Sequence, residues 1–175
     1  GKTLVTILLY STMFIPATAL TYPVYNLINN LHLYDTRGAL VLIYSCSGIA
    51  ISFFVIKNYY DNIPPDLEEA ARIDGCGYVQ TWVRVIFPIA RPGIMTAAVL
   101  AFLNNWNEYY WASLVLITRE KLTVPALLST FTTAFTTNYN GLFSAMVVII
   151  LPPVLLYCIF SKFFIEALSG GAVKG

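Results

Sequence analysis

Long apolar stretches alternate with polar segments along the sequence, and four of them are long enough to cross a membrane as helices. A spanning helix needs about 20 mainly apolar residues, because the hydrocarbon core is ~30 Å thick and each helical residue advances ~1.5 Å. The pattern therefore predicts an all-α fold, a polytopic transmembrane helical bundle that forms a single domain over residues 1–175. The predicted spans are residues 3–20, which contain Pro16, residues 38–57, residues 93–117, which have a polar middle, and residues 142–161, which are interrupted at Pro152 and Pro153.

The composition agrees with an integral membrane protein. Hydrophobic residues make up 58% of the chain and charged residues 11%. The mean hydropathy is +0.70, a balance that few water-soluble domains carry without aggregating. The net charge of +1 provides no basic field for nucleic acid. Cys46, Cys76 and Cys158 form no CxxC pair, and His32 has no ligand-type residues at suitable spacing, so no metal site is predicted.

Positive charges are distributed unevenly among the segments that flank the predicted spans. Seven of the ten Lys and Arg residues precede the first span, lie between the second and third spans or follow the fourth, and three lie in the other two connections. Cytoplasmic loops of membrane proteins collect Lys and Arg. The sequence therefore predicts that the loop of residues 58–92 and the C-terminus are cytoplasmic.

Residues 58–92 have the pattern of a helix, a turn and a second helix. Pro64 and Pro65 can begin a helix, whose first amides need no internal partner, and the acids that follow place negative charge at the positive end of the helix dipole. Gly75 and Gly77 are predicted to end this helix, because glycine adopts a left-handed backbone without steric cost. The acids are Asp66, Glu68 and Glu69.

A second loop helix is predicted after the glycines, from an apolar stripe at helical spacing. It is expected to end where Pro88 and the Arg91–Pro92 pair break the chain before the third span. The result would be a stiff cytoplasmic connection, attached to spans on both sides, which another protein could contact. An ordinary solvated loop, whose charges keep it in water, fits the composition equally well. The stripe consists of Tyr78, Val79, Trp82, Val83 and Ile86.

The two remaining connections also contain helical patterns. Apolar residues within residues 24–31 recur at helical spacing and predict a short helix on the membrane surface or against the spans. Asp35 and Thr36 then offer N-cap oxygens for the second span. Residues 118–141 contain an amphipathic stretch and end in a polar tip at Gly141, which faces outside by the charge argument.

Residues 69–88, EAARIDGCGYVQTWVRVIFP, resemble the signature loop of ABC importer membrane subunits. The shared features are a Glu-Ala-Ala triplet, a glycine four residues after the second alanine, and a hydrophobic-x-hydrophobic-Pro ending. Val85 and Phe87 stand where that ending usually has Ile and Leu. The matching positions are Glu69, Ala70, Ala71, Gly75 and Pro88.

Other stretches are similar to the carbohydrate-uptake branch of that family, in particular the maltose-transporter type. Such subunits usually have six spans, and the four predicted here match the last four, so two N-terminal spans are expected to be missing from this sequence. The resemblance covers essentially the whole chain and implies an ABC type-1 importer permease fold in a bacterial cell membrane. The stretches are MFIP at residues 13–16, LYDTRGALVL at 33–42, Trp106-Asn107-Glu108, and GGAVKG at 170–175.

The resemblance also implies several partners. A cytosolic ABC ATPase dimer would receive the first loop helix in a surface cleft and would use the ATP, so the chain itself would be neither an enzyme nor the holder of a cofactor. A second permease subunit would complete a heterodimer. An extracytoplasmic solute-binding protein would deliver a carbohydrate, an oligosaccharide or sugar derivative, to the outer loop at Asn138, Tyr139 and Asn140. The residues expected to couple to the ATPase are Glu68, Glu69, Ala70, Ala71, Asp74, Gly75 and Pro88.

Polar side chains form a stripe within the third predicted span, where Asn104, Asn107, Glu108 and Trp111 recur at helical spacing. Glu108 would lie about 22 Å along the helix, past the middle of the bilayer. A carboxylate at that depth is costly unless it is paired or hydrated, so the stripe should face a cavity or another helix. Either these side chains hold the span to its neighbours, or they line a path for the sugar.

Two other classes of protein compete with an ABC importer. A proton-coupled secondary transporter would use Glu108, and its uptake would survive ATP depletion. An intramembrane enzyme would need a paired nucleophile and base, and the sequence contains neither G-x-S-x-G nor H-E-x-x-H.

Overall fold

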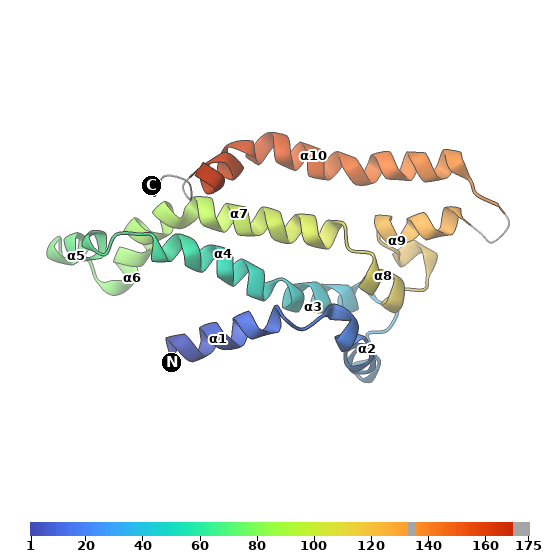
Figure 1. The fold of residues 1–175 in the computed structure, drawn as a ribbon, viewed down its shortest axis with the longest axis horizontal. Helices are drawn as coiled ribbons and strands as arrows, with labels where there is room; N and C mark the ends of the chain where they lie inside the picture. Colours follow the sequence, from blue (N-terminus) through green and yellow to red (C-terminus); the bar gives the residue numbers. More distant parts are fainter. Residues whose placement is uncertain (133–135, 170–175) are drawn as a thin grey trace.

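The computed structural model describes residues 1–132 and 136–169, in which all the long elements are α-helices (Figure 1). Within these ranges, three helical segments are long and apolar enough to cross a membrane: Arg37–Asp61, Tyr78–Trp106 and Tyr139–Ser161. A bent pair, Thr3–Thr12 with Ala17–Asn30, is a candidate for a fourth. The GGAVKG stretch at residues 170–175 lies outside the described residues.

The first predicted span, residues 3–20, is wrong as a single helix. Its place is taken by α1 (Lys2–Thr12), a 3-10 turn η1 (Ala17–Leu20) and α2 (Thr21–Asn30). The chain bends by 91° between α1 and the two later elements, because Pro16 lacks an amide proton and takes an extended backbone with ψ 137°. The short helix expected around residues 24–31 is confirmed as α2, which packs on the bundle through the buried Ile28.

The second predicted span, residues 38–57, is confirmed, with one irregular residue between its two helices. These are α3 (Arg37–Ser47) and α4 (Ile49–Asp61). Thr36 caps α3, since its hydroxyl oxygen accepts a hydrogen bond from the Ala39 amide (3.4 Å). The expectation that Asp35 also caps this helix is wrong, because its carboxylate binds residues 117–121 instead.

The predicted helix and turn after the second span are confirmed. α5 (Asp66–Ile73) begins after Pro65 and carries three acids in its first turn. The chain then reverses at Gly75, whose φ of 82° is left-handed. The left-handed backbone expected at Gly77 is wrong: with a φ of −69° this residue is the N-cap of the second loop helix, which starts with α6 (Tyr78–Thr81). We call residues 62–86 the elbow (Figure 1).

The expected break at Pro88 and Arg91–Pro92 is wrong. α6 continues through a π-helical turn, η2 (Trp82–Ile86), into α7 (Phe87–Trp106), and the three form one helix of 29 residues. A proline ring clashes with the carbonyl four residues earlier, which for Pro88 belongs to Arg84 in the π turn. The wider π turn relieves this clash, so the helix crosses Pro88 without ending.

The third predicted span, residues 93–117, begins too late and ends too late. α7 stops at Trp106, and a short α8 (Tyr110–Val115) follows after a break. The single helical stripe predicted through Asn104, Asn107, Glu108 and Trp111 is therefore wrong, because the break separates its members onto two helices and a connection.

The fourth predicted span is confirmed as α10 (Tyr139–Ser169), but the expected break at Pro152–Pro153 is wrong. Pro153 has no N–H to donate to the carbonyl of Ile149, four residues earlier. The indole N–H of Trp106 on α7 donates to that carbonyl instead, at 2.9 Å. The donor from the neighbouring helix satisfies a group that would otherwise be unpaired in lipid, so α10 remains continuous.

Replacing Trp106 with phenylalanine is expected to destabilise the α7–α10 contact. The ring can still stack on Phe102, now 5.6 Å away between centroids, but the Ile149 carbonyl loses its donor at a cost of about 1–3 kcal/mol. A lower melting temperature in detergent and a broader spin-label distance distribution between α7 and α10 are the expected results. Phe102→Leu is the matched control. An unchanged melting temperature and an unchanged α7–α10 distance distribution in Trp106→Phe would show that the indole hydrogen bond is unimportant.

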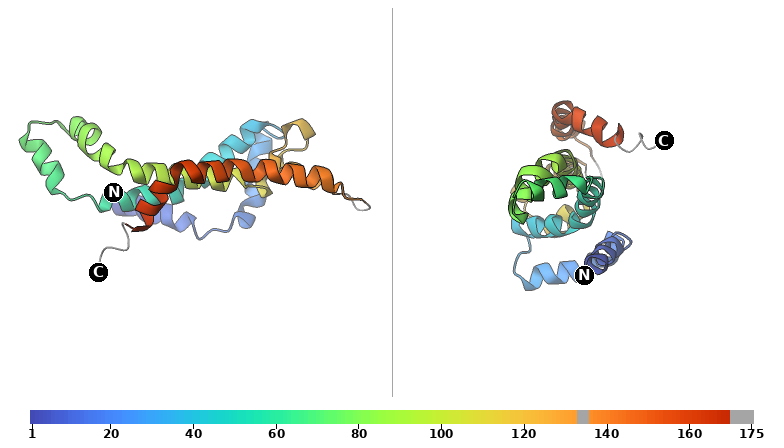
Figure 2. Two further views of the ribbon diagram at one scale, coloured as in Figure 1. Left: turned by 90° about the horizontal axis from the view of Figure 1, so that it is seen from above. Right: turned by 90° about the vertical axis from the view of Figure 1, so that its left-hand side faces the viewer.

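The bundle is elongated, with the elbow at one end and the main buried core at the other (Figures 1 and 2). α2, α8 and the start of α10 lie at the end away from the elbow, while the start of α1 and the end of α10 lie toward it. Short elements connect α8 to α10, as the amphipathic pattern predicted. They are η3 (Arg119–Lys121), α9 (Val124–Leu128) and η4 (Ser129–Phe131).

Candidate coupling elbow and transport site

The elbow exposes large apolar side chains, which distinguishes it from an ordinary solvated loop. Ile73 is 86% exposed, Tyr78 84% and Val79 72%. The helix that begins at Tyr78 has 29 residues, or about 43 Å, so its first turns extend beyond a ~30 Å hydrocarbon core. Exposed apolar groups of this kind mark surfaces that contact another molecule.

The residues predicted to couple to an ATPase occupy two places. Six of them lie on α5 and the turn after it, where Ala71 is buried and the other five are exposed. Pro88 lies apart from them, within α7. The six are Glu68, Glu69, Ala70, Ala71, Asp74 and Gly75.

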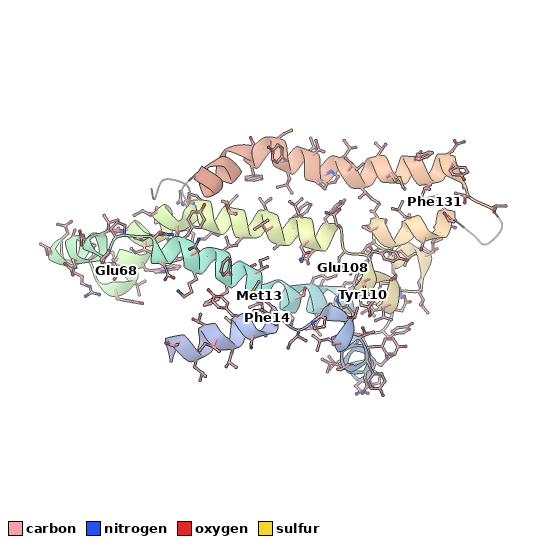
Figure 3. All side chains as sticks on the ribbon, viewed as in Figure 1. Met13, Phe14, Glu68, Glu108, Tyr110 and Phe131 are labelled. Carbon is pink, nitrogen blue, oxygen red and sulfur yellow. The ribbon has the colours of Figure 1, made fainter. Side chains whose placement is uncertain are left out.

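Glu108 joins three segments at the break after α7 (Figure 3). Its carboxylate accepts hydrogen bonds from the amides of Trp111 (2.8 Å) and Ala112 (3.1 Å), at the start of α8. It also accepts one from the Tyr44 hydroxyl on α3 (2.8 Å). The neighbouring Tyr110 hydroxyl bonds that of Thr21 and so ties α8 to α2. We call these contacts of Glu108 the first polar junction, and they support the interpretation that Glu108 holds α8 to the bundle.

Asp35 forms a second polar junction, which the sequence did not indicate as a site. Its carboxylate accepts hydrogen bonds from the amides of Ile117 (2.9 Å) and Thr118 (3.0 Å) and pairs with the Lys121 ammonium at 2.7 Å. Lys121, with the Thr118 hydroxyl and these amides, holds the pKa of Asp35 well below its usual range. Because Lys121 is 86 residues away in the sequence, no local pattern could have paired it with Asp35.

A cavity of about 480 Å³ lies between the bend after α1, helices α2 to α4, and the end of α7. Asn104 and Trp111 line it, whereas Asn107 and Glu108 are not among its lining residues. The Asn107 amide donates to the Leu103 carbonyl of its own helix (2.8 Å). The structure thus brings two of the four predicted path residues to one cavity, whose other walls are mainly apolar.

The outer position predicted to meet a binding protein is a helix start rather than a loop tip. Tyr139 and Asn140 lie in the first turn of α10, so the expected tip is wrong for them. The Asn138 side-chain oxygen accepts a hydrogen bond from the Gly141 amide (3.1 Å). Gly141 also packs closely on Phe131, since an added Cβ would lie 2.6 Å from that ring.

Several apolar helices long enough to cross a membrane, joined by a helical elbow at one end of the bundle, are the architecture of a polytopic membrane protein. The chain belongs to the family of binding-protein-dependent transport system inner membrane components, whose model matches residues 1–170. This match confirms the resemblance seen in the elbow sequence.

Individual relatives point in the same direction. The chain is 33% identical over its full length to the arabinooligosaccharides transport system permease protein AraQ of Bacillus subtilis, of which it covers 62%. It is 32% identical over 94% of its length to the trehalose transport system permease protein SugB of Mycobacterium tuberculosis, of which it covers 60%. A crystal structure of a bacterial ABC transporter involved in the import of the acidic polysaccharide alginate matches with a TM-score of 0.74 and 25% identity, over 94% of this chain and 62% of that one. The chain thus spans about three fifths of the length of these relatives.

Proposed function

We propose that the chain is part of the membrane-spanning permease subunit of a bacterial ATP-binding-cassette importer that carries a carbohydrate across the cell membrane. Family membership and the two relatives named for sugar transport support the transporter class and the substrate class. The observation that carries the proposal is the elbow, which exposes Ile73, Tyr78 and Val79 at one end of the bundle, next to the acidic α5. A cytosolic ATPase dimer that grips this surface would drive transport.

The elbow is well placed to transmit movement to two spans, because it joins the end of α4 to the start of α7. These helices pack closely where Gly93 faces Tyr59, since an added Cβ on Gly93 would lie 2.3 Å from the Tyr59 ring. Movement of α5 would therefore displace α4 and α7 together. ATP can shift the spans only if the ATPase prefers one of their arrangements over another.

The cavity beside Asn104 is the best candidate for a stretch of the sugar path. The Asn104 amide can bond sugar hydroxyls, and the Trp111 ring supplies an aromatic face. In this proposal Glu108 and Asn107 form hydrogen bonds within the bundle beside the path and do not contact the sugar.

We assign the remaining partners, which are lipid, a second permease subunit and a binding protein, to the sides and the outer end of the bundle. α1 and α10 expose many large apolar side chains, among them Leu4 at 64% and Ile159 at 68%, and these faces suit lipid and a second permease subunit in a heterodimer. The start of α10 around Asn138, Tyr139 and Asn140 would meet an extracytoplasmic binding protein. With the elbow inside, the end of α10 lies on the cytoplasmic side, as the positive charges predict.

A proton-coupled transporter using Glu108 is less well supported. Both oxygens of that carboxylate accept hydrogen bonds from fixed donors on α3 and α8. Protonation would take acceptor capacity away from this junction. A proton carrier is expected to face a water-filled path, whereas Glu108 is not among the residues that line the cavity.

The proposed function is tested by uptake in proteoliposomes that contain the full-length permease, its second membrane subunit and the ATPase. Labelled trehalose and arabinooligosaccharides are offered with the binding protein outside and with or without ATP inside. Uptake of one sugar is expected to require ATP and to persist when an ionophore collapses the proton gradient. Uptake that survives without ATP and stops with the ionophore would instead identify a proton-coupled transporter.

A further inference from the structure

The Asp35 junction extends beyond the contacts of its carboxylate. The Asp35 amide donates to the carbonyl of Val115, the last residue of α8 (2.9 Å). The Lys121 ammonium donates to the Asp35 carbonyl (2.6 Å) as well as to its carboxylate. The Arg37 guanidinium, at the start of α3, donates to the Glu120 carbonyl (2.9 Å). We call this set of bonds the clasp, because it joins the start of α3 to the chain that follows α8. Its residues are Asp35, Arg37, Val115, Ile117, Thr118, Glu120 and Lys121.

The backbone before α3 is bent so that Asp35 faces the end of α8. Asp35 and His32 have φ values of 54° and 56°, a left-handed conformation that is costly for most residues other than glycine. They are the two non-glycine residues with a positive φ within residues 1–132 and 136–169. Such strain persists only where the surrounding contacts impose it, and it is concentrated at functional positions. The bonds of the clasp are contacts of this kind at Asp35.

The clasp and Glu108 fix α8 to α3 at both of its ends. Glu108 caps the first turn of α8 and bonds Tyr44 on α3, and the clasp holds the residues that follow Val115. Between these ends, Ala112 and Val115 are fully buried in the core that α8 shares with α3. The connection from α7 to α8, by contrast, is the break at residues 107–109. α3 and α8 therefore form one rigid unit.

A second unit lies nearer the elbow. α4 and α7 pack against each other where Gly93 faces Tyr59, and a short irregular stretch separates each of them from the first unit. These stretches are Gly48, between α3 and α4, and the break between α7 and α8. The cavity extends over both units, because Trp111 of α8 and Asn104 of α7 both line it. A change in the angle between the units would therefore change the shape of the cavity.

We propose that Asp35 is a positioning residue for transport: it locks α8 to α3, so that Trp111 moves with α3 while Asn104 moves with α7. The inference rests on the proposed function and deepens it, since it identifies which walls of the sugar cavity move relative to each other. Asp35 is not among the residues that line the cavity, so it acts through α8 without touching the sugar. Without the clasp, Trp111 would lose its fixed position relative to α3.

Spin-label distances test which helices move together. The full-length permease, with its second membrane subunit and the ATPase, is placed in nanodiscs and labelled in pairs at exposed positions, which are Val41 on α3, Ser113 on α8 and Ala98 on α7. Between the nucleotide-free and ATP-bound states, the Val41–Ser113 distance is expected to stay constant and the Ala98–Ser113 distance to change. In Asp35→Ala, the Val41–Ser113 distribution should broaden. An Ala98–Ser113 distance that stays fixed, or a Val41–Ser113 distance that changes as much, would overturn the proposal.

Uptake kinetics in proteoliposomes separate positioning from stability. Asp35→Ala is expected to raise the concentration of labelled trehalose or arabinooligosaccharide that gives half-maximal uptake at least about fivefold. Lys121→Met leaves the bonds from the Ile117 and Thr118 amides in place and should give a smaller rise, which keeps the proposal testable if Asp35→Ala does not fold. Glu120→Gln is the matched control, because its carbonyl and not its carboxylate bonds Arg37, and it should change this concentration less than about twofold.

A purely structural clasp would give a different result. Lower melting temperatures in Asp35→Ala and Lys121→Met, with an unchanged half-maximal concentration and an unchanged Val41–Ser113 distribution, would overturn the positioning role and leave the importer intact. An unaltered complex that takes up neither sugar with ATP would count against the proposed function. The distance measurements need no sugar, so they would still decide whether α8 moves with α3.

Discussion

Replacing Gly75 with arginine is expected to lower carbohydrate uptake per ATP hydrolysed by roughly 5- to 30-fold. The turn after α5 needs a φ of 82° at this position, and a left-handed backbone costs any larger residue about 1–2 kcal/mol, a factor of roughly 5 to 30 in population. No atom lies within 4 Å of a Cβ built on Gly75, so the effect would come from the reoriented α5 and a bulky group on the docking surface. The ATPase would continue to turn over without moving the spans.

Uptake and ATP hydrolysis measured in the same proteoliposomes separate this result from simple inactivation. Gly75→Asn is the matched control, because asparagine tolerates left-handed geometry better than other residues, and it should retain most of the coupling. Normal coupling in Gly75→Arg would mean that the turn is not part of the transmission.

Replacing Glu108 with alanine is expected to have the second large effect, a loss of both stability and transport. The change removes the acceptor for the Trp111 and Ala112 amides and for the Tyr44 hydroxyl. Leaving such groups unpaired at a partly buried site costs about 1–3 kcal/mol. α8 would detach from α3, and the cavity wall formed by Trp111 would move with it.

Melting temperature in detergent and sugar uptake measure the two parts of this prediction. Tyr44→Phe deletes one of the three bonds and should give a smaller loss, and Glu108→Gln, which keeps one acceptor oxygen, should lie between them. A Glu108→Ala protein that melts normally but has lost uptake driven by a proton gradient would contradict the junction and support a proton-carrying role.

Hydropathy located the second and fourth spans, because burial in lipid places the same demand on every stretch of about 20 residues, but it missed the breaks that divide the first and third predicted spans. The elbow was also predictable. Its boundaries depend on local chemistry, the missing amide of Pro65 and the left-handed backbone of Gly75, and both act at the residue where they occur.

Helix breaks inside the membrane were harder to predict, because a proline breaks a helix only where its ring clash is not relieved or its freed carbonyl finds no other donor. Pro16 lies in the break between α1 and η1. Pro153 does not break α10, since Trp106, 43 residues before Ile149, supplies a donor to the Ile149 carbonyl. The break after Trp106 has no proline at all. It depends on Glu108, which caps the next helix, and an acid three residues before Trp111 was the one local signal for it.

The partners of Glu108 and Asp35 in the two polar junctions could not be predicted from the sequence. Tyr44 lies 64 residues from Glu108 and Lys121 lies 86 residues from Asp35. Only the folded bundle brings these partners together. The interpretation of Glu108 as a residue that holds spans together needed no such pairing, because an isolated carboxylate in lipid is too costly to leave without donors.

Photocrosslinking from the elbow in intact cells tests most directly whether an ATPase grips this surface. A benzophenone amino acid is placed at Ile73, which is 86% exposed, or at Tyr139, which is 63% exposed at the opposite end of the bundle. With the full-length protein, the Ile73 probe should capture a nucleotide-hydrolysing subunit and the Tyr139 probe should not. Failure of the Ile73 probe to capture such a subunit, or equal capture from both ends, would contradict the account.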